Sequence, residues 1–449
     1  MPEDATRTGG FMSSLIALLL AAQPASAFCG AYASSAGADI YNSVSEVAIV
    51  RQGNRTTLTV ANDVQGAGGA AFAMLVPVPE ILTADDVQVL AHETFDVLDA
   101  YSRPRLVTYT CDDFEPVWTD PCADYMIKAS AEMAVMDSGA IDEGSTVNVE
   151  AEFVVGEYDI VILSAEESDD LFNWLADEGF SVSEATEDVV QEVLDSGAYF
   201  FAAKLSEAAA IEDGEMLSPL RFSYESDVFG LPIRIGTAAS KGQQDLIIYA
   251  VTDFADGSVA ISNYPEMSFD DECMIDGPSF EADHDSDLGS YYQQQFTDAY
   301  TAEPGADWMV EYTWGNGHCD PCTGTEPDSQ LLANVGFDFE QGGSGYMFTR
   351  LHMRYTPEEA TEDVSLYLSG LTEQSQMRFI EHNQKLESRF PVCGIGEVEN
   401  PGQCEYVNPY PEECGSGDCG CAVSDRTSHL GWLGLAGLVV LGIGRRRKH

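Results

Sequence analysis

Alternating apolar and polar residues predict β-strands through much of the chain between residues 28 and 394. Residues 47–66, "VAIVRQGNRTTLTVANDVQG", contain two β-rich runs around a Gly-Asn turn. Residues 70–79, "AAFAMLVPVP", predict a buried strand that ends at two prolines. Further strands are expected at residues 106–111, 146–163, 219–224, 232–236, 245–253 and 346–356.

Helical patterns are fewer. Ser164 and Glu167 form an S-x-x-E capping box ahead of the apolar residues of "LFNWL", and Gly179 ends the run. A second helix is expected at residues 184–194 and a third at 372–388, "TEQSQMRFIEHNQKLES". The predicted fold class is therefore α+β, a strand-rich domain with a few helices, and the apolar stripes are expected to be core.

The start of the chain has the pattern of a secretory signal peptide over residues 1–27. An apolar run at residues 15–22 precedes Ala25 and Ala27, which form an A-x-A cleavage site ahead of Phe28. The leader departs from the pattern because it carries one arginine against two acids. We expect export, and an uncleaved signal anchor is the alternative.

The end of the chain has three parts. Residues 395–429 are rich in Cys, Pro, Gly and Glu and predict a disordered, solvated stalk. Residues 430–444 are apolar, and a helix of this length spans about 22 Å, short of a hydrocarbon core of about 30 Å. Residues 445–449, "RRRKH", are basic and are expected to stay cytoplasmic.

This arrangement resembles the MYXO-CTERM sorting signal, on the evidence of "DCGCAV" followed by "LGWLGLAGLVVLGIGRRRK". The resemblance implies that a membrane protease cuts near Cys419 or Cys421 and leaves the protein anchored at the cell surface, which includes the outer membrane. If one of the 11 cysteines becomes the anchor, ten remain for pairing. The alternative is an ordinary single-pass C-terminal membrane helix with two incidental cysteines.

The charge balance narrows the possible partners. The chain has 76 acidic and 20 basic residues and a formal net charge of -56. Nucleic acid is not an expected partner, because its phosphates would be repelled. The charge indicates a solvated acidic surface.

Cysteines in an exported chain are expected to form disulfides. Cys319 and Cys322 form a C-x-x-C motif beside His318, and we expect them to form a structural disulfide. The alternatives for this motif are a redox pair and a metal site. Cys111 and Cys122 are a second candidate pair.

Calcium is the one cofactor that the sequence suggests. Asp283, Asp285 and Asp287 alternate as carboxylates do in calcium loops. The rest of the loop departs from that pattern, since Leu288 stands in place of glycine and Gln294 in place of glutamate. An acidic surface loop is the alternative.

No catalytic residue is expected. "GGSGY" at residues 342–346 lacks the second glycine of a nucleophile elbow, and the histidines form no H-E-x-x-H motif. His352 lies within a predicted strand and is interpreted as a packing residue.

The body of the chain resembles the exported bacterial family named domain of unknown function 2330, which has no assigned activity. The motifs that carry the resemblance lie at residues 72–79, 171–180, 231–252, 318–322 and 349–364. We expect an exported, surface-anchored protein with a structural or binding role in the envelope. The alternatives are a secreted hydrolase acting on envelope or prey polymers and a calcium-stabilised adhesion module.

Overall fold

The computed structural model describes most of the expected exported domain and one short segment beyond it. The described residues are 30–35, 45–64, 71–111, 147–183, 186–205, 215–237, 242–268, 273–274, 284–302, 305–316, 326–341, 345–381 and 404–407. The expected signal peptide, sorting motif, hydrophobic segment 430–444 and basic end all lie outside them.

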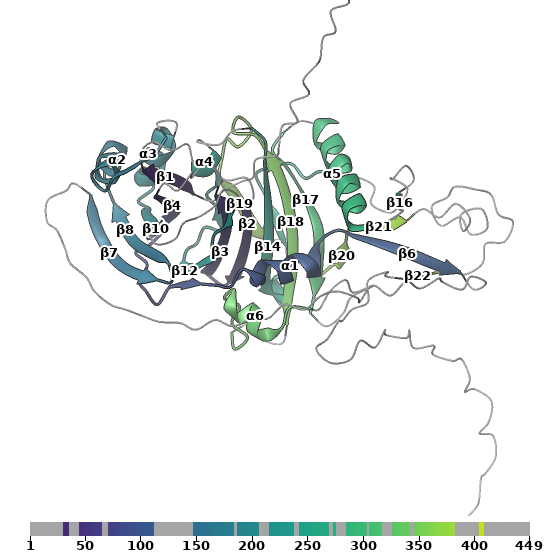
Figure 1. Ribbon diagram of the computed structural model, residues 1–449. Helices are drawn as coiled ribbons and strands as arrows, with labels where there is room; N and C mark the ends of the chain where they lie inside the picture. Colours follow the sequence, from purple (N-terminus) through teal and green to yellow (C-terminus); the bar gives the residue numbers. More distant parts are fainter. Residues whose placement is uncertain are drawn as a thin grey trace, which may run out of the picture.

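Within the described residues the largest sheet has nine strands (Figure 1). Its neighbouring strands are antiparallel except for β14 and β2, which pair in parallel. In spatial order the strands are β20 (Ser375–Gln376), β17 (Asp307–Gly315), β18 (Tyr346–Tyr355), β14 (Gln244–Asp253), β2 (Ser45–Gln52), β3 (Arg55–Val64), β12 (Leu220–Glu225) and β5 (Val87–Val89), with β11 (Glu215–Met216) also paired to β3.

A second, six-stranded sheet is antiparallel throughout its described length. Its order is β7 (Asn148–Val155), β8 (Tyr158–Ser164), β10 (Tyr199–Leu205), β4 (Phe72–Val78), β1 (Ala31–Ser35) and β9 (Phe180–Ser181). Two small sheets complete the strands. The first consists of β13 (Gly230–Leu231), β19 (Val364–Leu368) and β15 (Val259–Ile261). The second consists of β16 (Cys273–Met274), β21 (Arg378–Glu381), β6 (Arg105–Cys111) and β22 (Cys404–Val407).

The two large sheets share one apolar core. Phe201 of the smaller sheet stacks on Phe222 of the larger one at 5.4 Å between ring centroids, within a cluster that draws on both sheets. The sheets are joined this way because each presents alternate apolar side chains to the other.

Helices cover the outer faces of both sheets. The α-helices of the described residues are α1 (Glu93–Ser102), α2 (Ser168–Asp177), α3 (Glu187–Asp195), α4 (Ile233–Thr237), α5 (His284–Ala302) and α6 (Ser329–Asn334), and η2 (Phe254–Asp256) is a 3-10 turn. Helices α2 and α3 pack on the six-stranded sheet, and α1 and α6 pack on the nine-stranded sheet. Helix α5 lies beside β17 and β18 (Figure 1). The resulting arrangement, with sheet facing sheet and helices outside, confirms the predicted α+β class.

Most predicted strands are confirmed, but residues 232–236 are not a strand. They form most of α4, in which Ile233 and Ile235 are both buried. Their alternation imitates a strand, whereas Pro232, directly before the helix, favours a first helical turn.

The helix predicted at residues 372–388 is also wrong where the structure describes it. Met377 and Phe379 are buried at alternate positions, and Arg378 to Ile380 pair with β6. Pairing with β6 therefore outweighs the helical propensity of this polar stretch.

The predicted capping box does not start α2. Ser164 is the last residue of β8 and its hydroxyl donates to Glu150 Oε1 at 2.6 Å. The helix begins at Ser168, after Glu167, whose side chain makes no cap hydrogen bond. Three further helices, α1, α5 and α6, were not predicted, and α4 was predicted as a strand.

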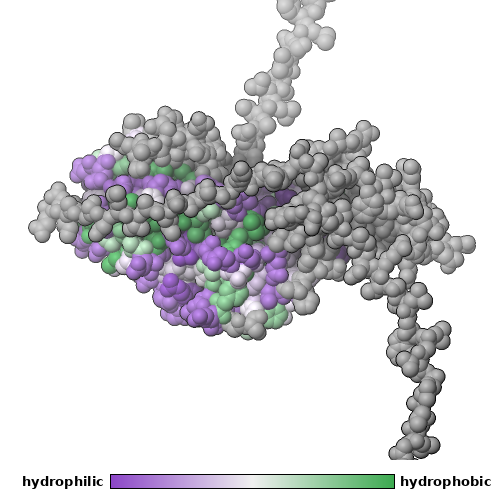
Figure 2. Space-filling model, turned by 60° about the horizontal axis from the view of Figure 1, so that its bottom comes forward, coloured by the Kyte–Doolittle hydropathy of each residue, from purple (hydrophilic) through white to green (hydrophobic). Residues whose placement is uncertain are grey.

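The surface of the described residues mixes polar and apolar side chains. On the face in Figure 2, hydrophilic and apolar residues are interspersed over the coloured part of the molecule. No helix in the described part of the chain is long and apolar enough to cross a bilayer.

Candidate functional sites

A row of buried charged side chains lies on the outer face of the nine-stranded sheet. Arg350, His352 and Arg354 alternate along β18 on the same face as Phe348, which packs beneath α1. None of the three charged residues is more than 7% exposed. Because β18 lies inside the sheet, its neighbours must supply compensating charges.

Both ring nitrogens of His352 are hydrogen-bonded. Nδ1 lies 2.8 Å from Glu311 Oε1, and Nε2 lies 2.9 Å from Asp245 Oδ1. The ring also stacks on Phe296 of α5, with 4.0 Å between centroids. Burial alone would lower the pKa of His352, but the two carboxylates raise it above its ordinary value of 6.5.

The two carboxylates have further cationic partners. Arg350 Nε donates to Glu311 Oε2 at 2.5 Å, and Arg354 donates to both oxygens of Asp245 at 2.6 and 3.1 Å. Burial opposes ionisation of Glu311, but Arg350 and His352 hold its pKa at about 2. We call these five side chains the ionic cluster.

Two helices are fastened to the sheet by the ionic cluster. Arg350 Nη1 donates to Asp99 of α1 at 2.6 Å. Arg354 donates to Thr297 and Gln293 of α5 at 3.1 and 3.0 Å. The paired charges of the cluster therefore hold α1 and α5 in place on the sheet.

This geometry favours a structural role for His352 over a catalytic one. A general base must reach a substrate proton and have a free nitrogen, and here both nitrogens are engaged beneath α5. The expectation that His352 packs inside a strand is confirmed, but its contacts are ionic as well as apolar.

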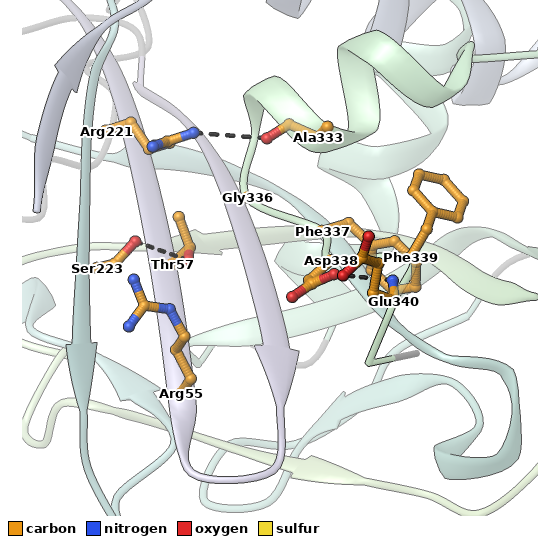
Figure 3. A pocket seen from close by; sticks show the side chains of 10 residues that line it. All are labelled: Arg55, Thr57, Arg221, Ser223, Ala333, Gly336, Phe337, Asp338, Phe339 and Glu340. Atoms are coloured by element: carbon orange, nitrogen blue, oxygen red, sulfur yellow. Dashed lines mark hydrogen bonds between the residues drawn. The ribbon is translucent and has the colours of Figure 1, made fainter. Parts of the chain in front are cut away.

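An open site lies on the same sheet, where β3 and β12 meet the segment after α6. We call it the arginine groove; its volume is about 420 Å³ (Figure 3). It is lined by Arg55, Thr57, Arg221, Ser223, Ala333, Gly336, Phe337, Asp338, Phe339 and Glu340.

The floor of the arginine groove follows from strand register. Thr57 lies opposite Ser223, and their hydroxyl oxygens are 2.9 Å apart. Arg55 and Arg221 lie two positions from this pair in opposite directions, on the same face of the sheet. The two arginines therefore flank a hydroxyl pair.

The facing wall is the segment from Gly336 to Glu340. Gly336 has φ +106°, and a Cβ there would lie 2.4 Å from Thr57 Cγ2, so this wall rests directly on the floor. Asp338 is held at its backbone by Gln52, whose side chain accepts from its N–H at 2.8 Å and donates to its carbonyl at 3.0 Å. The Asp338 carboxylate accepts from Glu340 N at 2.8 Å.

The two arginines differ in their partners. Arg55 Nη1 lies 3.9 Å from Glu225 Oε1 at the surface. Arg221 Nη1 donates to the carbonyl oxygens of Asn334 and Ala333 at 2.7 and 3.5 Å, and Arg221 forms no ion pair with any described carboxylate. Burial lowers the pKa of Arg221, and the nearby charge of Arg55 lowers it further.

Most of the site residues predicted from sequence fall outside the described residues. These are Ala27, Phe28, Cys122, Asp283, Cys319, Cys322, Cys419 and Cys421. Cys111 ends β6, where its register partner is Cys404 of β22, so this part of the expected stalk is a strand.

The proposed calcium loop is in part helical. Asp285 and Asp287 belong to α5, which begins at His284. Across the described stretches there is no group of three or more His, Cys, Asp or Glu side chains that could hold a metal. Calcium binding with Asp283 stays a prediction.

Sequence reasoning missed the arginine groove. Its residues come from three separate segments, and only the register of β3 against β12 brings Arg55 and Arg221 to one face. The sequence offered only a weak signal for this site. Two arginines occupy polar positions of strands with an alternating pattern, in a chain with few basic residues.

Comparison with known proteins gives one match. A family model described as an uncharacterized protein conserved in bacteria matches residues 23–367. No curated protein and no solved structure matches the chain. The matched span includes the arginine groove and the ionic cluster.

Proposed function

The chain belongs to the bacterial family named domain of unknown function 2330, and for this member we propose a non-enzymatic role as an exported, surface-anchored protein that binds a ligand in the arginine groove. Export rests on the signal-like residues 1–27. Anchoring rests on the tail from residue 395 onward, with a sorting protease that acts near Cys419 or Cys421 and a membrane as partners.

The arginine groove is the observation that carries the binding role. Small-molecule sites are concave and hold a few convergent polar groups. Here Arg55, Arg221, Asp338 and Glu340 surround a volume of about 420 Å³ that is open to solvent. Its walls are fixed in advance, since Gln52 and Gly336 position the segment opposite the strands.

A hydrolase that relies on a histidine base has less support. Such an enzyme needs that histidine to be accessible. His352, the histidine that the fold places among carboxylates, is only 3% exposed and is bonded at both nitrogens.

A groove-filling variant tests the binding role. Ala333 lines the groove from the exposed face of α6, so Ala333→Trp fills it without entering the core. Ala176 is likewise exposed, on α2, which packs on the other large sheet, and Ala176→Trp is the matched control. We expect detergent-solubilised protein to sediment with washed envelope fragments, and Ala333→Trp alone to abolish this. Equal retention of both variants would contradict the proposal.

A further inference from the structure

The floor of the arginine groove carries two of the 20 basic residues of a strongly acidic chain, Arg55 and Arg221. The net charge is -56, and several described bases are neutralised by carboxylates, as Lys204 is by Glu178 and Arg234 is by Glu192. Arg221 instead donates hydrogen bonds from Nη1 to two carbonyl oxygens at the end of α6, and it forms no ion pair within the described ranges. Its charge is therefore available to a ligand that enters the groove.

The second arginine strengthens this site. Arg55 and Arg221 lie on either side of the Thr57–Ser223 hydroxyl pair along the floor. Two like charges held this close disfavour each other, which is why the charge of Arg55 contributes to the lowered pKa of Arg221. An anion between them would relieve that repulsion, and guanidinium groups match the planar geometry of oxyanions.

The opposite wall has complementary chemistry. Asp338 and Glu340 line the groove across from the arginines. Ionised carboxylates are hydrogen-bond acceptors only. A ligand that fits both walls therefore carries an oxyanion at one end and hydroxyl donors at the other.

We propose that the arginine groove is a binding site for an acidic sugar, in which Arg55 and Arg221 hold the carboxylate or phosphate group while Asp338 and Glu340 accept hydrogen bonds from the sugar hydroxyls. This inference rests on the proposed binding function and names its ligand class. Ser223 lies between the arginines and supplies a further hydroxyl contact to the oxyanion.

The test is a calorimetric titration of the full protein from native membranes, in detergent at about 0.15 M salt, where fields from distant surface charges are screened beyond about 8 Å. The probes are glucuronate, glucose 1-phosphate and neutral glucose. We expect at least one of the acidic sugars to bind and glucose to bind at least about tenfold more weakly, because hydrogen bonds between charged groups are stronger than those between neutral groups. Binding of glucuronate alone assigns a carboxylate ligand, and binding of glucose 1-phosphate alone assigns a phosphate.

Charge variants identify the site. Arg221→Gln and Arg55→Gln should each weaken binding of the acidic sugar about tenfold or more. Arg103→Gln is the matched control, because Arg103 is an exposed arginine paired with Asp99 outside the groove; it should leave binding within about twofold. Ala333→Trp, which fills the groove from a surface helix, provides a second loss of binding that does not depend on removing Arg221.

Two results would overturn the inference: glucose binding as tightly as both acidic sugars, or no binding of any probe by the folded wild-type protein. Neither would remove the proposed function if Ala333→Trp still abolished sedimentation with the envelope. In that case the groove would bind a ligand of different chemistry.

Discussion

His352 shows how a single side chain depends on its partners in this protein. Its imidazole lies between the carboxylates of Glu311 and Asp245 and beneath the ring of Phe296. A buried charge without a partner is far more costly than a paired one. Removal of the imidazole therefore takes one hydrogen-bond partner from each of the two buried carboxylates.

We expect His352→Leu to lower the free energy of unfolding by about 3–5 kcal/mol, the usual cost of removing one partner from a buried ion pair. Urea unfolding of the purified protein measures this. His92→Leu, at an exposed position ahead of α1, is the control and should change stability by less than about 0.5 kcal/mol. A His352→Leu variant as stable as the control would contradict the stabilising role of His352 in the cluster.

The ionic cluster also predicts how stability changes with pH. The pKa of His352 is raised by folding, so its contribution is complete below the ordinary value of 6.5 and is lost as pH rises through the higher folded value. The pKa of Glu311 is lowered to about 2, so its contribution is complete above 4.5 and is lost as pH falls toward about 2.

Urea midpoints measured from acid to alkaline pH should therefore decline on both sides of a maximum. In the His352→Gln variant the decline that belongs to His352 on the alkaline side should disappear, while the acid decline from Glu311 remains. An alkaline decline that is unchanged in His352→Gln would assign it to another group.

Among the elements, the segment after α6 shapes the arginine groove because it lies against β3. Gly336 permits this contact through its positive φ and its missing side chain. Gln52 of β2 then fixes Asp338 by two backbone hydrogen bonds.

Gly336→Ala should destabilise the protein by about 1–2 kcal/mol for the left-handed backbone and by about 1–3 kcal/mol more for the collision with Thr57. Gly179→Ala is the matched control, since Gly179 has φ +86° but open space around its Cβ position. Thermal or urea unfolding of both variants measures the difference. Equal losses in the two variants would mean that the segment does not rest on Thr57.

The pairing of β22 with β6 predicts a disulfide. Cys404 lies opposite Cys111 in this antiparallel pair. Opposed Cα atoms in such pairs are about 4.5–5.5 Å apart, within the range of about 4.4–6.8 Å that disulfides span. We expect peptide mapping of the non-reduced protein to link Cys111 to Cys404; a link from Cys111 to Cys122 would support the sequence-based pairing instead.

Sequence patterns predicted elements better than they predicted sites. The strands at residues 245–253 and 346–356 are confirmed, because alternating apolar and polar residues are a local signal of a strand. Residues 232–236 imitated that alternation within a short helix. Within residues 372–388, the strand β21 forms by pairing with β6, which is distant in the sequence. A local pattern of residues does not contain that contact.

The candidate sites were harder to predict for the same reason. Arg55 and Arg221 share a face only through strand pairing. His352 was recognised as a strand residue, but Glu311 and Asp245 come from two other strands. Such constellations depend on the assembled sheet, whereas the sequence places their members far apart.

At the scale of the whole molecule, the ionic cluster and the proposed binding site occupy different parts of the nine-stranded sheet. The ionic cluster fastens α1 and α5 to the sheet, and the arginine groove opens elsewhere on that sheet (Figures 1 and 3). The net charge of -56 suits a solvated surface, and the proposed export and anchoring rest on the patterns of residues 1–27 and 395–449.

The proposed place of this molecule at the cell surface is tested most directly by intact mass and C-terminal peptide mapping of the protein recovered from its native membrane fraction. We predict a chain that begins at Phe28 and ends near Cys421 with an added mass of lipid size. A chain that still ends at His449 would contradict surface anchoring and make the protein a single-pass protein of the inner membrane.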